Sequence, residues 1–223
     1  MKEIQLSLKG TSPYSQSRPH TTPKLNKETP DAHEARTWMN RLHVKDGQVF
    51  IPGNAIRNCL AEAAKFLSIQ IPGKGKATYT KHFESGIIVP NDLLLFSSIT
   101  GETIVPPSLE EIERAKSISP TSVVSEVSTY QPKTNEAYAD WIFTPADGVP
   151  GSGKRVWKCY PIVMNWQSIF KVIILDDTIT EDVFHRVLEQ AGVLIGLGRY
   201  RVRNRGSYGQ FIVESINVIQ DVS

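Results

Sequence analysis

The first residues of the chain alternate between polar and apolar side chains. Ile4, Leu6 and Leu8 are each followed by a polar residue, and the pattern stops at Gly10. Successive side chains of a strand point to opposite faces of a sheet, so this alternation predicts a half-buried strand. Similar alternation or short apolar runs predict further strands at 48–51, 156–163, 168–175 and 211–219, and a hairpin formed by 87–89 and 93–96.

Two segments place apolar residues at helical spacing, which predicts amphipathic helices. Residues 53–68 carry one such stripe, at Ala55, Ile56, Cys59, Leu60, Ala63, Ala64 and Leu67. Residues 180–191 carry the other, at Val183, Phe184, Val187, Leu188 and Ala191. Thr180 is a favourable N-cap for the second helix, and Gly192 marks its expected end.

The order of these elements predicts an α+β fold. With the middle of the chain set aside, the order is strand, helix, strand, strand, helix, strand, which is that of the ferredoxin-like (RRM-like) βαββαβ sandwich. Residues 99–154 are rich in Ser, Thr and Pro and form a large insertion between the two halves, predicted to be a thumb-like arm. Residues 11–36 have a similar composition and are expected to be a long flexible loop. The whole chain, 1–223, is expected to be a single domain.

Composition restricts the class of protein without identifying it. The chain has 223 residues, of which 40% are hydrophobic and 22% charged, as in ordinary globular proteins. We find no apolar run of membrane-spanning length and no export signal, so we expect a cytoplasmic protein without a membrane partner. Cys59 and Cys159 lie in neither a CxxC pair nor a zinc-type cluster. They are expected to be buried free thiols, and no metal or cofactor is expected.

The distribution of charge is more informative than the net charge of +2. No acidic residue lies between Glu189 and Glu214, yet this segment contains four arginines. The segment between Glu62 and Glu84 also lacks acids and contains four lysines. Basic, acid-free segments in a nearly neutral protein indicate surfaces that face a polyanion.

The segment 196–209, here called the Gly/Arg loop, concentrates these signals. Its glycines include Gly196, Gly198 and Gly206, and they let the backbone approach a ligand closely. Arginines at alternate positions fall on one side if the segment is extended, and they suit phosphate binding: Arg199, Arg201, Arg203 and Arg205. Tyr200 and Tyr208 offer stacking surfaces for bases. Two other interpretations remain open, namely a tight helix-to-strand turn with solvated arginines, and a site for another anion.

The Gly/Arg loop and the start of the first predicted helix resemble those of the RAMP superfamily, the ferredoxin-like RNA-binding subunits of CRISPR effector complexes. The segment GLGRYRVRNRGSYGQF resembles the family's glycine-rich loop between a helix and a strand. The segment VFIPGNAIRNCL, residues 49–60, resembles the family's entry into the first helix, although Asn54 stands where Ser or Thr is frequent. The C-terminal half also resembles small proteins of bacteriophage genomes, so the chain could equally be a phage-encoded relative of the superfamily.

The resemblance implies an RNA-binding module that grips the sugar-phosphate backbone. It would be a subunit of a CRISPR-type or phage ribonucleoprotein assembly that self-associates or contacts other subunits. A phage protein that binds single-stranded DNA is an alternative. Besides the Gly/Arg loop, four basic residues are candidate phosphate contacts: Arg57, Lys74, Lys76 and Lys81. The three lysines belong to a stretch that is equally well explained as a basic surface loop.

Catalysis is the remaining alternative, as a metal-independent RNA endonuclease of the RAMP type. The resemblance directs attention to His20, His33 and His43, because such enzymes use a histidine as general acid or base. Asp31 is a further candidate by comparison with target-cleaving relatives, although it also suits the N-cap of a short helix. Ordinary roles are the favoured interpretation, as polar surface residues for the histidines and as a helix cap for Asp31. No compact catalytic constellation is evident, so a non-catalytic protein is favoured.

Overall fold

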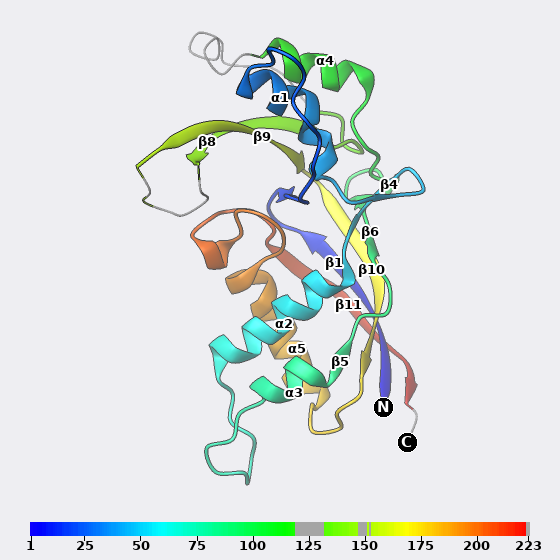
Figure 1. Ribbon diagram of the computed structural model, residues 1–223. Helices are drawn as coiled ribbons and strands as arrows, with labels where there is room; N and C mark the ends of the chain where they lie inside the picture. Colours follow the sequence, from blue (N-terminus) through cyan, green and yellow to red (C-terminus); the bar gives the residue numbers. More distant parts are fainter. Residues whose placement is uncertain (119–131, 147–150, 152, 222–223) are drawn as a thin grey trace.

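The computed structural model describes residues 1–118, 132–146, 151 and 153–221 (Figure 1). Its longer strands are β1 (Lys2–Gly10), β4 (Gln48–Ile51), β8 (Tyr138–Pro145), β9 (Arg155–Val163), β10 (Trp166–Ile174) and β11 (Phe211–Asp221). Its two-residue strands are β2 (Tyr14–Ser15), β3 (Val44–Lys45), β5 (Ile87–Ile88), β6 (Leu93–Leu94) and β7 (Phe96–Ser97). The α-helices are α1 (Pro30–Thr37), α2 (Gly53–Leu67), α3 (Thr80–Ser85), α4 (Leu109–Ser117) and α5 (Glu181–Gln190). Helices alternate with antiparallel sheets, which confirms the α+β class.

The main sheet has the strand order β11-β1-β10-β5, and β7 also pairs with β10. All of these pairings are antiparallel, with Leu6 opposite Phe170 on one side and Ile216 on the other. The alternation of β1 has the expected effect, because Ile4, Leu6 and Leu8 are buried while the intervening residues are only partly covered. The strands predicted at 1–10, 168–175 and 211–219 are therefore confirmed.

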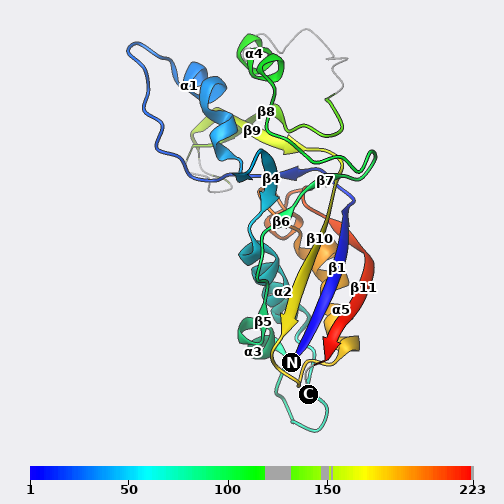
Figure 2. The same ribbon diagram turned by 90° about the vertical axis from the view of Figure 1, so that its right-hand side faces the viewer.

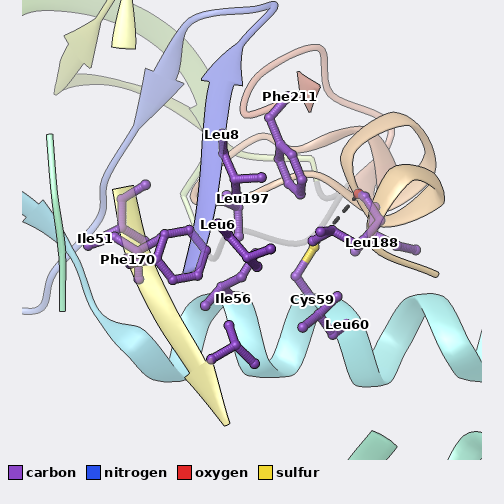
Figure 3. Packing of buried hydrophobic residues seen from close by; sticks show 14 of the residues in the cluster. Leu6, Leu8, Ile51, Ile56, Cys59, Leu60, Phe170, Leu188, Leu197 and Phe211 are labelled. Atoms are coloured by element: carbon purple, nitrogen blue, oxygen red, sulfur yellow. Dashed lines mark hydrogen bonds between the residues drawn. The ribbon is translucent and has the colours of Figure 1, made fainter. Parts of the chain in front are cut away.

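Helices α2, α3 and α5 cover one face of the main sheet (Figures 1 and 2). Figure 3 shows the apolar layer between them, in which Ile56 and Leu60 of α2 face Leu6 and Phe170 of the sheet. The thiol of Cys59 also points into this layer and donates a hydrogen bond to the carbonyl oxygen of Gly196, at 3.4 Å. This contact fixes the middle of α2 against the start of the Gly/Arg loop.

A second sheet, of order β2-β9-β8, lies at the other end of the molecule. It has its own small apolar cluster, built from Trp38, Ala115, Ala139 and Cys159. This cluster lies among α1, α4 and the 3-10 turn η1 (Trp38–Arg41). The strand predicted at 156–163 exists as β9, but its expected place in the main sheet is wrong. The second strand of that sheet is instead the two-residue β5.

The hairpin expected from 87–89 and 93–96 is also wrong. β5 pairs with β10, whereas β6 pairs with β4 in a third sheet of order β3-β4-β6. The first run and Leu93–Leu94 therefore lie in different sheets, while Phe96 begins β7 and returns to the main sheet. Pro90 and Asp92 occur at the crossing between them, and Asp92 accepts a hydrogen bond from the backbone N–H of Gly53 at 3.1 Å.

The boundaries of α5 are partly as expected. The hydroxyl of Thr180 accepts a hydrogen bond from the N–H of Val183, so the predicted N-cap is confirmed. Gly192 is not the end of the helix, because the chain continues through the π turn η2 (Ala191–Ile195). The turn ends at Gly196, whose φ of 75° is a conformation that favours glycine. The Gly/Arg loop begins there.

The two ranges expected to be irregular contain packed elements. Within 11–36, Tyr14, Ser15 and Gln16 are buried, and Gln16 donates a hydrogen bond to the carbonyl oxygen of Phe50 at 2.6 Å. The described part of 99–154 includes α4 and β8, which join the second apolar cluster. Mobility stays a prediction for the remainder of each range, and residues 119–131 of the arm lie outside the described residues. Among the described residues, no helix is both long enough and apolar enough to cross a membrane.

Both cysteines are buried and free, as the sequence predicts. Burial raises the pKa of the Cys59 thiol to about 12 and also raises that of Cys159. Because the thiolate is the reactive form, we expect neither cysteine to react with an aromatic disulfide reagent in the native protein near neutral pH. Both should react after denaturation, and absorbance of the released thiolate measures this. Rapid stoichiometric labelling of the native chain would contradict the burial.

Candidate nucleic-acid interface

The Gly/Arg loop is compact rather than extended. Tyr200 and Arg205 have positive φ values, of 55° and 61°, and between them lies the 3-10 turn η3 (Val202–Asn204). The N–H of Tyr208 donates back to the carbonyl oxygen of Tyr200 at 3.0 Å, which closes the loop. The alternation of the four arginines would place them on one side only in an extended backbone, and that condition is not met here.

The glycines allow the loop to pack this closely. A Cβ atom on Gly206 would lie 1.8 Å from the carbonyl oxygen of Tyr200, and one on Gly209 would lie 1.8 Å from that of Leu197. Gly209 N–H also donates to the carbonyl oxygen of Pro13 at 2.7 Å. The loop is thus held by its own backbone and by the segment next to β2. Part of its glycine content serves the turn, which was one of the open interpretations.

Two of the arginines are held by one carboxylate. Arg201 and Arg203 form ion pairs with Glu62 of α2, at 2.9 and 3.1 Å. Arg201 is the more covered, with 24% of its side chain exposed against 51% for Arg203. Arg201 thus anchors the loop on the helix, whereas Arg203 keeps part of its guanidinium free for a ligand.

Arg199 and the two tyrosines have distinct surroundings. Cζ of Arg199 lies 3.5 Å from the centroid of the Tyr160 ring on β9, which is a close cation–π contact. The rings of Tyr200 and Tyr208 meet edge to face, with centroids 5.6 Å apart. Tyr200 is half exposed, so its ring remains accessible to a ligand. Burial raises the pKa of Tyr208, and the negative charge of Asp140 acts in the same direction.

A cleft of about 680 Å³ lies between this loop and the β8–β9 hairpin. The loop contributes Arg199, Tyr200, Arg203, Asn204 and Arg205 to its lining. The hairpin side contributes Ile142, Phe143, Thr144, Pro145, Gly151, Arg155, Lys158 and Tyr160. The described lining therefore combines five cationic side chains with aromatic rings and contains no carboxylate. We call this the basic cleft.

The hairpin side of the basic cleft was not found from the sequence. Arg155 and Lys158 lie on β9. Arg155 is exposed and its Cζ atom lies 5.6 Å from the centroid of the Phe143 ring, whereas Lys158 is partly exposed. A signal for them exists, because residues 148–175 contain no acid. It is the same kind of signal that identified the Gly/Arg loop. The two acid-free segments meet across the cleft.

Besides Glu62, which pairs with Arg203, the carboxyl group of Asp140 lies close to this cationic surface. Burial raises the pKa of Asp140 on β8, while the positive charges of Arg199 and then Arg114 act in the opposite direction. Arg114 is itself held by the carboxylate of Glu111, at 2.7 and 2.8 Å.

The other expected phosphate contacts lie outside the basic cleft. Arg57 on α2 donates a hydrogen bond to the carbonyl oxygen of Glu84 at 2.9 Å. Lys74 and Lys76 belong to the loop between α2 and α3, and Lys81 belongs to α3. This loop lies at the end of the molecule away from the β8–β9 hairpin (Figures 1 and 2). A single cleft therefore does not unite the two basic segments.

The candidate catalytic histidines lie apart from the basic cleft. The rings of His20 and His33 stack with centroids 6.3 Å apart, and His33 Nε2 lies 2.9 Å from the carbonyl oxygen of Thr22. Burial lowers the pKa of His20, with a contribution from Arg41, and burial also lowers that of His43. A shallow depression beside His20 is lined by Arg18, Pro19, His20, Thr21, Thr22 and Asn40.

Asp31 stands in the first turn of α1 rather than at its N-cap. The N-cap is Thr29, whose hydroxyl accepts a hydrogen bond from the N–H of Ala32 at 3.2 Å. Glu34 pairs instead with Arg41, at 2.8 Å. The N-cap expected at Asp31 therefore lies two residues earlier, and Asp31 is an acid near the positive end of the helix dipole.

Comparisons with known proteins give structural likeness alone. No protein-family model matches the sequence, and no curated protein matches it. The chain is similar to one in the cryo-EM structure of the type III-B Cmr-beta bound to cognate target RNA, with a TM-score of 0.47 and 11% identity over 98% of this chain. It is also similar to Cmr6 from Pyrococcus furiosus, with a TM-score of 0.40 and 12% identity over 94% of this chain and 97% of that one. This chain spans 61% of the length of the Cmr-beta chain that it resembles.

Proposed function

We propose that the protein binds RNA in the basic cleft, gripping the sugar-phosphate backbone. The observation that carries this proposal is the convergence of five cationic side chains on one cleft whose described lining has no carboxylate. Arginine pairs well with phosphate oxygens, and a groove of cations with exposed aromatic rings suits a flexible polyanion. The exposed rings, those of Phe143 and Tyr200, provide surfaces on which bases stack.

The proposal divides the residues of the Gly/Arg loop by role. Arg203 and Arg205 contact phosphates together with Arg155 and Lys158 of β9. Arg201, paired with Glu62, anchors the loop. Gly196, Gly198 and Gly206 permit its compact path, and Tyr200 and Tyr208 complete its surface. Arg57, Lys74, Lys76 and Lys81 stay candidates for a separate contact with a longer RNA.

The fold supports a finer assignment. We propose that the main sheet and its helices form a ferredoxin-like arrangement, with β1, α2, β5, β10, α5 and β11 as its βαββαβ units. The sheet order β11-β1-β10-β5 places the last strand beside the first, as this arrangement requires. Together with the two sequence motifs, it supports membership of the RAMP superfamily or of a phage-encoded relative.

The chain then acts as a single RAMP-like domain within a ribonucleoprotein. We propose that residues 99–154 serve as a thumb-like arm, whose strand β8 forms one edge of the cleft. Self-association or contact with other subunits would continue the RNA path beyond one copy. The described lining of the cleft contains no histidine, so the endonuclease alternative gains no support from this site.

Binding of a labelled single-stranded RNA of mixed sequence, followed by fluorescence anisotropy at several salt concentrations, tests the proposal. Each phosphate contact on a single strand adds about 0.7 to the slope of log K against log salt, so up to five cations give a slope of at most about −3.5. A single-stranded DNA of the same sequence is the matched ligand. Absence of binding to either, or binding that does not depend on salt, would contradict the proposal.

A further inference from the structure

Arg199 differs from the other arginines of the Gly/Arg loop in how it is held. Its Nη1 atom is shielded from solvent and has no hydrogen-bond partner among the described residues. Its Cζ atom lies 3.5 Å from the centroid of the Tyr160 ring. Its backbone N–H donates to the carbonyl oxygen of Ser15 on β2 at 2.8 Å. Arg199 is partly buried, and the face of the Tyr160 ring is its close electrostatic partner, besides the more distant charge of Asp140. Removal of the ring would therefore leave the shielded part of this guanidinium with less compensation.

Tyr160 is held in turn by residues of α1 and η1, on the side away from the Gly/Arg loop. Cζ of Arg41 also lies over its ring, 4.9 Å from the centroid. Arg41 forms two hydrogen bonds to the carboxylate of Glu34, at 3.0 and 2.8 Å, and both side chains are largely covered. Glu34 also accepts a hydrogen bond from the backbone N–H of Cys159 at 3.3 Å. Cys159 is thus fixed to α1 through Glu34, and Tyr160 is fixed to η1 through Arg41.

These contacts connect the two walls of the basic cleft. Arg155 and Lys158 extend from β9, whereas Arg203 and Arg205 extend from the Gly/Arg loop. β9 belongs to the second sheet, and the loop leads into β11 of the main sheet. The contact between Tyr160 and Arg199 is a side-chain bridge from one wall to the other, and it lies in the lining of the cleft itself.

We propose that Tyr160 is a positioning residue that sets the spacing between the two cationic walls by holding Arg199. This inference rests on the proposed function, and it assigns Arg199 to the framework of the cleft rather than to phosphate contact. A preorganised cleft does not have to arrange its cations when the RNA arrives, so the ordering cost of binding is smaller. Loss of the aromatic ring therefore weakens binding without removing any phosphate contact.

The test compares Tyr160→Leu with Tyr160→Phe, which keeps the ring face. In nuclear magnetic resonance spectra, the side-chain protons of Arg199 should be shifted upfield by the ring in the native protein and in Tyr160→Phe, but not in Tyr160→Leu. Exchange of the Arg199 amide proton should accelerate only in Tyr160→Leu. That variant should bind RNA about tenfold more weakly, the equivalent of one cation–π contact, with an unchanged salt slope. Tyr160→Phe should restore the affinity.

The outcomes separate this inference from the proposed function. If Tyr160→Leu loses the Arg199 shift but keeps its RNA affinity, or if its salt slope falls, Tyr160 does not have the positioning role. If native protein binds no RNA, the proposed function fails, and the shift and the amide exchange still decide whether the ring holds Arg199. Should Tyr160→Leu fail to fold, Arg199→Lys replaces it, because lysine keeps the charge without the planar guanidinium. Equal affinity of Arg199→Lys and native protein would overturn the inference.

Discussion

Replacing Arg155, Lys158 and Arg205 together with glutamine should weaken RNA binding by on the order of 100-fold near physiological ionic strength, if each lost phosphate contact costs about 1 kcal/mol. All three line the basic cleft, and none forms an ion pair with another described residue. The salt slope should become shallower by about 2, because three contacts each worth about 0.7 disappear. Fluorescence anisotropy of a labelled RNA measures both quantities.

The matched control is the triple replacement of Lys74, Lys76 and Lys81 with glutamine. It changes the net charge by the same amount, and these exposed lysines lie at the end of the molecule away from the β8–β9 hairpin. We expect it to alter the affinity for a short RNA by less than about threefold, since only long-range electrostatics is affected. If the control loses as much affinity as the cleft triple, total charge rather than the cleft determines binding. If only the control weakens binding, the contact surface is the loop between α2 and α3.

Gly209→Ala should lower the free energy of unfolding by about 3 kcal/mol or more. The new Cβ would lie 1.8 Å from the carbonyl oxygen of Leu197, and the residue has a φ of 70°. Gly73→Ala is the control, because Gly73 has a φ of 73° with open space around its Cβ position. Gly73→Ala therefore lowers the free energy of unfolding only by the cost of placing alanine at a positive φ, which is about 1 kcal/mol. Urea unfolding followed by circular dichroism gives both values.

The difference between the two variants isolates the cost of disrupting the Gly/Arg loop. Gly209 N–H and C=O both form backbone hydrogen bonds, to Pro13 and Leu197, so a shift at this residue moves the loop relative to its supports. Gly209→Ala should therefore also lose RNA affinity, even at temperatures where it remains folded. Equal destabilisation in the two variants would mean that the loop absorbs the added methyl group, and that its close packing is not required.

The sequence predicted those elements whose periodicity is sustained. β1, β10, α2 and α5 were found because each is an element of nine residues or more with at least three regularly spaced apolar positions. The partner of β9 could not be found this way. A short apolar run has the same pattern whichever sheet it joins. β5, which takes the place expected for β9, has only two residues and so shows no period.

The candidate site was predicted in part for a similar reason. Glycines and arginines located the loop, but the arrangement of the arginines depends on tertiary partners. Glu62 lies far from Arg201 and Arg203 in sequence, and Tyr160 lies far from Arg199. Such pairs follow from the packing of α2 and β9 against the loop, which a local pattern does not contain. Arg155 and Lys158 were detectable as members of an acid-free segment, although no motif marks them.

The two apolar clusters have a consequence for how the molecule opens. The larger cluster lies under the main sheet, whereas the smaller one, around Trp38 and Cys159, stabilises the second sheet with far fewer buried side chains. Native proteins open in cooperative units whose stabilities differ with their buried contacts. Sub-global opening of the smaller unit would detach β8 and most of β9, although Val163 at the end of β9 packs in the larger cluster, while the main sheet remains folded. The basic cleft would then be lost on heating before most of the secondary structure. Loss of the proposed RNA binding should therefore begin at a lower temperature than the loss of the circular dichroism signal.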